Sequence, residues 1–295
     1  MKRALSSQPE LEAQARLGRW HVVSTVAESG AGHVGGPMSA MDLLVALFFR
    51  VLNVRPEEPD WGDRDRFILS KGHSAVGLYA VMAQRGYFPI AELTTFDTGD
   101  SRLQGHPDMT RLPGLDASTG SLGQGLAVGV GIALGAKLRG SGFGTFVMLG
   151  DGECQEGMVW ESVQVAARYG LANLVAIVDH NGLQQYGWPL GDELDPRGDR
   201  SEPWPGNKLR EVFEAFGWRV LEIDGHNFDE IIGACADARE ATSGSQPTAI
   251  LARTIKGRGL AFTEGRHAWH ARIPTPDELD AARHELGIDA SGQPG

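Results

Sequence analysis

A glycine-flanked aspartate and a distant asparagine are the residues in this chain best suited to hold a cation. Gly150-Asp151-Gly152 follows a predicted strand, and Asn181 follows the next predicted strand along the chain. In a parallel sheet both positions lie at the carboxyl ends of neighbouring strands, the edge at which open α/β sheets bind ligands. Carboxylate and amide oxygens are hard ligands suited to Mg²⁺ or Ca²⁺. The pattern therefore predicts a divalent cation held by Asp151 and Asn181.

The glycine after the aspartate predicts a second kind of binding. Gly152 leads into the following predicted helix, so its backbone N–H and the helix dipole can bind an anion such as a phosphate. Phosphate oxygens could also complete the coordination of the cation. An isolated Gly-Asp-Gly is usually a plain turn and an isolated asparagine a cap. Their positions after successive strands favour the interpretation as a cation and phosphate site.

Several histidines lie in glycine-containing loops, where an imidazole can reach a ligand. They are His33, His73, His106 and the pair His267 and His270. A single loop histidine is usually a surface residue. Four such loops along one α/β chain indicate a shared pocket, in which imidazoles would bind hydroxyls or phosphates and transfer protons near neutral pH.

The segments between these residues alternate between strand and helix patterns. Strands are predicted over 66–70, 145–149, 173–179, 218–223 and 248–253, with helices over 11–26, 38–52, 120–138, 157–169 and 227–242 and one ending near residue 85. This alternation predicts an α/β fold, a mostly parallel sheet with helices on both faces. No domain boundary is evident, so residues 1–295 are expected to form a single domain with residues 290–295 as a frayed tail. Residues 97–116 and 189–205 are expected to be irregular.

Composition narrows the class of protein. The formal net charge of −11 argues against a nucleic-acid partner. No apolar stretch approaches the length of a membrane-spanning helix, and the N-terminus lacks the apolar core of a signal peptide. The two cysteines form no framework and fit a reducing compartment. We therefore expect a cytoplasmic protein that does not bind membranes.

The sequences around the two expected ligands resemble transketolase, a thiamine-diphosphate enzyme. Residues 150–157 read Gly-Asp-Gly-Glu-Cys-Gln-Glu-Gly, and residues 177–184 read Ile-Val-Asp-His-Asn-Gly-Leu-Gln. The resemblance runs from about Trp20 to Ile273. It implies the diphosphate-binding domain of the thiamine-diphosphate-binding fold, with Mg²⁺ or Ca²⁺ held by Asp151, Asn181 and the backbone carbonyl of Leu183.

The histidine loops also match transketolase one by one. The resemblance implies that His33 contacts the donor sugar, that His73 lies near the diphosphate and that His106 binds the first hydroxyl of the substrate. It implies that His267 touches both diphosphate and substrate. His270 is the competing candidate for that role, because the alignment around the intervening tryptophan is ambiguous.

The remaining expected site residues also come from the resemblance. The sequence Thr-Gly-Ser-Leu-Gly-Gln-Gly at 119–125 matches the stretch that borders the aminopyrimidine ring, which implies cofactor contacts for Gly120, Ser121 and Leu122. Gly152 and Glu153 are likewise expected to contact the cofactor. Glu156 is expected to link two active sites across an interface, although a solvated acid at a helix N-terminus is the simpler interpretation.

The chain stops where the pyrimidine-binding domain of a full-length transketolase would begin. In the family that domain supplies the glutamate that activates the cofactor. We therefore expect a separate C-terminal transketolase subunit that carries this glutamate, and a heterotetramer with active sites at its interfaces. The assembled enzyme is expected to transfer a two-carbon ketol unit from a ketose, often phosphorylated, to an aldose acceptor.

Two other functions stay open at this point. One is a different thiamine-diphosphate reaction, such as deoxyxylulose phosphate synthesis or 2-oxo acid decarboxylation. The other is a non-catalytic partner that binds cofactor and only regulates. The chain departs from the transketolase pattern at Tyr186 and in the sequence His33-Val34-Gly35-Gly36, so the identity of the sugar stays undetermined.

Overall fold

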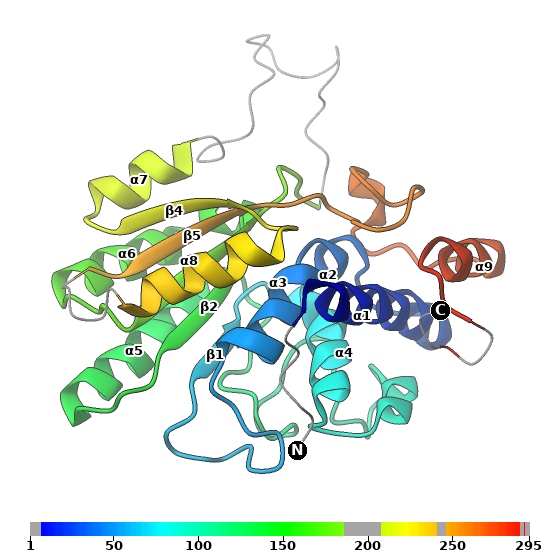
Figure 1. The fold of residues 1–295 in the computed structure, drawn as a ribbon, viewed down its shortest axis with the longest axis horizontal. Helices are drawn as coiled ribbons and strands as arrows, with labels where there is room; N and C mark the ends of the chain where they lie inside the picture. The colour runs from blue at the N-terminus through cyan, green and yellow to red at the C-terminus, as the bar shows by residue number, and fades with distance from the viewer. Residues whose placement is uncertain (1–6, 186–207, 241–245, 290–291, 293–295) are drawn as a thin grey trace, which may run out of the picture.

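A five-stranded parallel sheet forms the centre of the molecule (Figure 1). The structure, a computed structural model, describes residues 7–185, 208–240, 246–289 and 292. The strand order is β1-β2-β3-β5-β4, and every pair of neighbours is parallel. The strands are β1 Arg66–Leu69, β2 Thr145–Gly150, β3 Leu174–His180, β4 Arg219–Asp224 and β5 Thr248–Arg253. The predicted α/β fold with a parallel sheet is confirmed.

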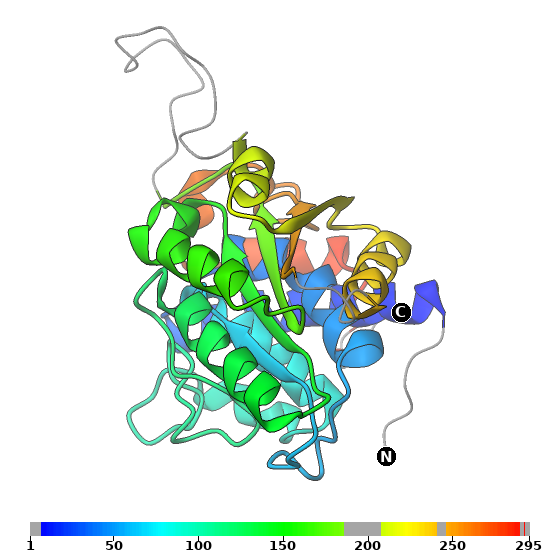
Figure 2. The same cartoon turned by 90° about the vertical axis from the view of Figure 1, so that its left-hand side faces the viewer.

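Helices cover both faces of this sheet, as Figures 1 and 2 show. One face carries α5 Gln124–Arg139, α6 Gly157–Arg168 and α7 Leu209–Ala215. The other carries α1 Gln8–Ser29, α2 Gly35–Ser39, α3 Met41–Ala46, α4 Ala75–Arg85 and α8 Phe228–Glu240. Successive residues of a strand point to opposite faces, and in β2 Phe146 and Met148 join one core while Val147 and Leu149 join the other. Burial on both faces explains why the central strands are continuous apolar runs.

Two predicted helices differ from the structure in their bounds. The helix expected over 120–138 begins only at Gln124, because Gly120 and Gly123 have φ of 148° and 81°, outside the helical region. The helix expected over 38–52 is divided into α2, α3 and a π-helical turn, Leu47–Val51. The sequence did not predict the helices α7 and α9 Pro276–Glu285, nor the 3₁₀ segments at Gly72–Ser74, Ile90–Thr95, Gly152–Gln155 and His267–Trp269.

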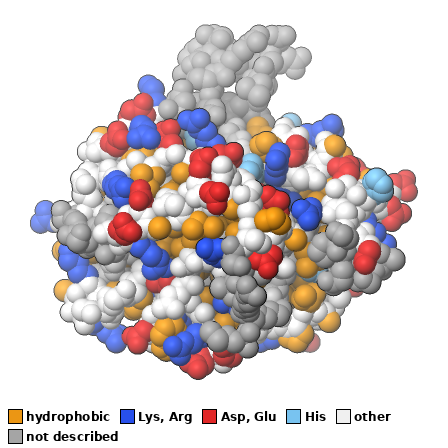
Figure 3. All heavy atoms as spheres, viewed as in Figure 1, with side chains coloured by type: hydrophobic (Ala, Val, Ile, Leu, Met, Phe, Trp, Pro, Cys, Tyr) orange, Lys and Arg blue, Asp and Glu red, His pale blue; other side chains and the backbone are white. Residues whose placement is uncertain are grey.

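Other expectations concern the surface, membrane-spanning helices and the residues outside the described ranges. Acidic and basic side chains are interspersed on the face seen in Figure 3, so the net negative charge is not gathered into one patch there. No helix in the described part of the chain is long and apolar enough to cross a membrane. The loop expected over 189–205, the frayed tail over 290–295 apart from Gly292, and Tyr186 lie outside the described residues.

The first helix contains a buried histidine that makes folding stability depend on pH. Burial lowers the pKa of His21 in α1 from 6.5 to about 4, and its Nε2 atom has no hydrogen-bond partner within the described residues. The unfolded chain therefore binds the proton more tightly than the folded chain does. The contribution of His21 to stability is complete above pH 6.5 and is lost as the pH falls to 4, by roughly 3 kcal/mol in the free energy of unfolding.

We expect His21→Phe to flatten the dependence of the unfolding free energy on pH between 4 and 6.5. Urea denaturation at a series of pH values measures this slope. His284→Phe, which replaces an exposed histidine of α9, is the matched control and should leave the slope as in the wild type. An unchanged slope in His21→Phe would show that the acid sensitivity originates elsewhere.

Candidate active site

A cavity of about 380 Å³ lies at the carboxyl edge of the sheet. The turns that follow β1, β2, β3 and β5 line it together with the segment before α2, so residues far apart in sequence meet there. The lining residues are His33, Gly36, Lys71, His73, Gly120, Leu122, Gly150, Asp151, Gly152, Glu153, Gln155, Glu156, Asn181, Leu183, Gln184, Gln185, Lys256 and His270. Most of the site residues expected from the sequence are therefore brought to one cavity.

The three expected metal ligands occupy adjoining turns. Gly150 pairs with Asp179 in the register of β2 and β3, so the residues that follow each strand meet beyond the edge of the sheet. The Asp151 carboxylate accepts hydrogen bonds from the backbone N–H of Gly152 at 2.9 Å and of Gly182 at 2.6 Å. The Oδ1 atom of Asn181 accepts from the backbone N–H of Leu183 at 3.1 Å. The bond from Gly182 to Asp151 thus joins the two turns, and the oxygens of Asp151 and Asn181 lie near each other.

The electrostatics of this turn fit a divalent cation. Burial, together with the nearby carboxylate of Asp179, raises the pKa of Asp151 to about 6. No lysine or arginine of the described residues forms an ion pair with this half-buried carboxylate, and only the more distant charges of His180 and Lys256 offset that of Asp179. No group of three His, Cys, Asp or Glu in the described ranges could hold a metal. A cation at this turn would use a mixed oxygen set, in which the phosphate oxygens of a ligand complete the coordination.

A buried lysine, which the sequence did not single out, stands beside these ligands. Lys71 is 1% exposed; its ammonium pairs with the fully buried Asp179 and donates to the carbonyl oxygen of Gly36 at 3.2 Å. The carboxylate of Asp179 also accepts from the hydroxyls of Ser39 and Thr254. Lys71 follows a strand at the ligand-binding edge, and this position is the signal that could have identified it.

Three imidazoles cluster in the lining of the cavity. The ring centroids of His33, His73 and His270 lie 5.0 to 5.3 Å apart. Burial lowers the pKa of His33 to about 4 and that of His270 to about 3, and it holds the pKa of His73 well below its usual value. These rings are therefore neutral at pH 7, which suits hydrogen bonding to sugar hydroxyls.

His270, rather than His267, faces this cavity. His267 begins an exposed 3₁₀ turn and does not line the cavity, and the intervening Trp269 is buried in the core. The Nδ1 atom of His270 lies 3.2 Å from the ammonium of Lys256, a second lining residue that the sequence did not single out. The backbone N–H of Val34 donates to the carbonyl oxygen of His270 and ties the loop of His33 to it.

Two further expected residues lie at or beyond the rim. His106 is exposed, and its ring centroid lies 6.1 Å from that of His33. It borders an adjoining open cavity of about 610 Å³, lined also by Asp97 and Asp108. Ser121 is exposed and does not line the main cavity, whereas its neighbours Gly120 and Leu122 do.

The two expected glutamates have different surroundings. Glu153 is buried, and its carboxylate accepts from Ser70 Oγ at 2.5 Å, from Gly123 N at 2.8 Å and from Gly150 N at 3.1 Å. The carboxylate of Glu153 therefore links the Gly-Asp-Gly turn to the start of α5. These bonds indicate that Glu153 holds the turn in position. Glu156 is exposed at the N-cap of α6 and lines the cavity.

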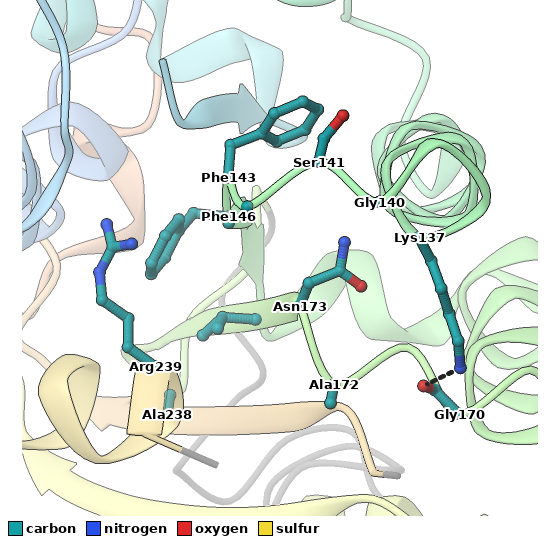
Figure 4. Close-up of a pocket in the computed structure, with 13 residues that line it drawn as sticks. Lys137, Gly140, Ser141, Phe143, Phe146, Gly170, Ala172, Asn173, Ala238 and Arg239 are labelled. Atoms are coloured by element: carbon teal, nitrogen blue, oxygen red, sulfur yellow. Dashed lines mark hydrogen bonds between the residues drawn. The ribbon is translucent and has the colours of Figure 1, made fainter. Parts of the chain in front are cut away.

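A second cavity, of about 560 Å³, opens at the amino edge of the sheet (Figure 4). The cationic side chains that line this cavity already have hydrogen-bond or ion-pair partners. Lys137 donates to the carbonyl oxygens of Tyr169 and Gly170 at 2.8 and 2.9 Å, and Arg239 pairs with Asp65. The titratable side chains expected from the sequence converge at the carboxyl edge instead, so we assign the active site to that edge.

Comparison with known proteins agrees with this geometry. Residues 12–293 match the model of the transketolase, thiamine diphosphate binding domain family. A 6-deoxy-6-sulfo-D-fructose transketolase subunit from Clostridium sp. (strain MSTE9) is 40% identical, over 95% of this chain and 97% of its own. One of the subunits of an apulose-4-phosphate transketolase from Actinobacillus succinogenes is 38% identical, over 95% of this chain and 97% of its own.

Longer proteins match over part of their length only. The crystal structure of transketolase from Campylobacter jejuni superposes with a TM-score of 0.84 and 30% identity, covering 96% of this chain and 44% of that one. Human transketolase is 37% identical over 87% of this chain and 38% of its own. The chain therefore spans less than half the length of these transketolases, while it spans nearly all of the two subunits.

Proposed function

The chain belongs to the transketolase family, and from this premise we propose that it is the diphosphate-binding subunit of a split, thiamine-diphosphate-dependent transketolase. The assembled enzyme would transfer a two-carbon ketol unit from a ketose to an aldose acceptor. The observation that carries this proposal is the juxtaposition of an oxygen-rich turn, Asp151 with Asn181, and a cluster of neutral imidazoles on the walls of one cavity. The turn suits a metal diphosphate, and the imidazoles suit a sugar.

The residues of the turn would hold the cofactor. Asp151, Asn181 and the carbonyl oxygen of Leu183 would bind Mg²⁺ or Ca²⁺, which in turn binds the diphosphate. The N–H of Gly152 and the imidazole of His73 would contact the diphosphate, and Gly120, Ser121 and Leu122 would border the aminopyrimidine ring. Bound thiamine diphosphate would supply a nucleophilic carbon for the carbonyl group of the sugar.

The imidazoles would bind the substrate and move protons. The ammonium of Lys256 can only donate, so Nδ1 of His270 accepts and the proton of this neutral ring lies on Nε2. His270 can therefore donate from Nε2 to a sugar oxygen and act in proton transfer. His33 and His106, from loops on the same side, would bind donor hydroxyls. His267 is exposed, so we assign to His270 the contact with both diphosphate and substrate that was expected of one of these two histidines.

A second subunit would complete the site. The chain spans less than half of the solved transketolases, so we propose a C-terminal subunit that supplies the pyrimidine-binding domain and the glutamate that activates the cofactor. Two copies of each chain would form a heterotetramer, with the exposed Glu156 linking two active sites. Both subunit relatives are named for ketoses with an anionic group at one end, and we propose a donor of this type.

Calorimetric titration of thiamine diphosphate tests the cofactor assignment. The experiment is run with and without Mg²⁺, on the chain alone and mixed with the C-terminal transketolase subunit of the same organism. We expect binding that requires Mg²⁺ and strengthens when the partner is present. Absence of binding under all four conditions would refute the proposed function.

A further inference from the structure

A serine outside the cavity makes contact with the amide of one expected metal ligand. Ser39, in α2, is fully buried, and its Oγ has three polar neighbours. They are a carboxylate oxygen of Asp179 at 2.6 Å, the carbonyl oxygen of Gly36 at 3.0 Å and the amide nitrogen of Asn181 at 3.4 Å. Ser39 is not among the residues that line the cavity, so its hydroxyl acts through its neighbours.

The hydrogen-bonding capacity of these groups fixes the orientation of the amide. A hydroxyl has one proton to donate and lone pairs with which to accept. Asp179 and the carbonyl of Gly36 can only accept, so the hydroxyl proton of Ser39 is directed to them. Its lone pairs then face Asn181, and only the NH₂ end of that amide can donate to them. The carbonyl end, Oδ1, then points away from Ser39, and there it accepts from the backbone N–H of Leu183 at 3.1 Å.

The charge on Asp179 stabilises this orientation of the Ser39 hydroxyl. Its carboxylate is fully buried and pairs with the ammonium of Lys71, and the hydroxyl of Thr254 donates to its other oxygen. The ammonium of Lys71 and the hydroxyl of Thr254 thus both act as donors to the carboxylate, so it accepts from Ser39 as well. A hydrogen bond to a buried carboxylate is among the stronger ones in proteins.

We propose that Ser39 is a positioning residue that holds the amide of Asn181 with its oxygen toward the metal. The proposal rests on the proposed function, because it assumes that Asn181 binds the metal. Without the hydroxyl, the backbone N–H of Leu183 would be the remaining described group that favours this orientation, and the amide could more readily present its NH₂ end, which repels a cation. Groups behind metal ligands typically contribute about 10- to 100-fold to metal affinity, and we expect an effect in this range.

The chain provides a matched control on the same carboxylate. Ser39 and Thr254 each donate one hydroxyl bond to Asp179, but of these two hydroxyls that of Ser39 alone is within hydrogen-bond distance of the Asn181 amide. Ser39→Ala and Thr254→Val therefore remove equivalent bonds from Asp179. Ser39→Ala also removes the oxygen that accepts from the Asn181 amide, whereas Thr254→Val leaves it in place.

Titration of Mg²⁺ into the complex of the chain with its partner, at saturating thiamine diphosphate, measures the apparent Kd of the metal. We expect Ser39→Ala to raise this Kd at least tenfold, and Thr254→Val to change it less than threefold. Ser39→Cys, which keeps the size of the side chain but bonds weakly, should resemble Ser39→Ala and guards against a folding defect. Thermal unfolding of each variant without metal checks that the folds are equally stable.

The outcomes separate this inference from the proposed function. Wild-type Mg²⁺ affinity in Ser39→Ala or in Ser39→Cys, or an equal loss in Thr254→Val, would overturn the role of Ser39 and leave the proposed function intact. Absence of Mg²⁺-dependent cofactor binding in the wild type would overturn both.

Discussion

Asp151→Asn is expected to weaken the Mg²⁺-dependent binding of thiamine diphosphate by at least about 100-fold, since loss of a ligand should exceed the loss of a group behind it. The carboxylate is half-buried, no lysine or arginine of the described residues forms an ion pair with it, and the neighbouring Asp179 repels it. A divalent cation relieves this unfavourable arrangement. The amide of asparagine keeps the shape of the side chain but not its charge, so the fold should persist while the cation is lost.

Calorimetry with the partner subunit present measures this effect. Asp224→Asn is the matched control, because Asp224 also ends a strand at the carboxyl edge but lies outside the cavity. We expect the control to bind cofactor as the wild type does. Equal binding by Asp151→Asn and the wild type would show that the diphosphate is held without this carboxylate.

His270→Ala is expected to lower kcat/KM for ketol transfer by about 10² to 10⁴, the usual range for loss of a proton-transferring side chain. The ring of His270 lies in the cavity against His33 and His73, and Lys256 fixes which nitrogen carries the proton. His267→Ala should change kcat/KM by less than about twofold, because His267 is exposed and does not line the cavity.

Steady-state rates of the assembled enzyme, at saturating cofactor, compare the two variants directly. Cofactor binding should persist in both, so that the difference lies in the reaction of the sugar. A larger loss in His267→Ala than in His270→Ala would mean that the loop from 264 to 272 rearranges when the partner binds.

The sheet could be predicted from sequence because each central strand is a short apolar run that ends at polar or glycine residues. The same reasoning located Asp151 and Asn181, since consecutive parallel strands bring their carboxyl ends together. The start of α5 was misplaced because apolar periodicity does not reveal the backbone of Gly123, whose φ is positive.

Other parts of the site depend on contacts that sequence spacing does not encode. His267 and His270 lie in an irregular segment, where no periodicity tells which side chain points inward; the buried Trp269 settles it by anchoring the turn. Asp179 lies within a strand, and its pairing with Lys71 joins residues 108 positions apart. Such long-range polar pairs become visible only once the fold is known.

Reconstitution of ketol transfer tests the split-enzyme account most directly. This chain, the C-terminal transketolase subunit of the same organism and an equimolar mixture of the two are assayed separately. Each assay contains thiamine diphosphate, Mg²⁺, a panel of ketose donors that carry a phosphate or a sulfonate, and an aldose phosphate acceptor. The account predicts transfer only in the mixture, with a rate that saturates at one copy of each chain. Transfer by this chain alone, or none in a mixture that binds the cofactor, would contradict it.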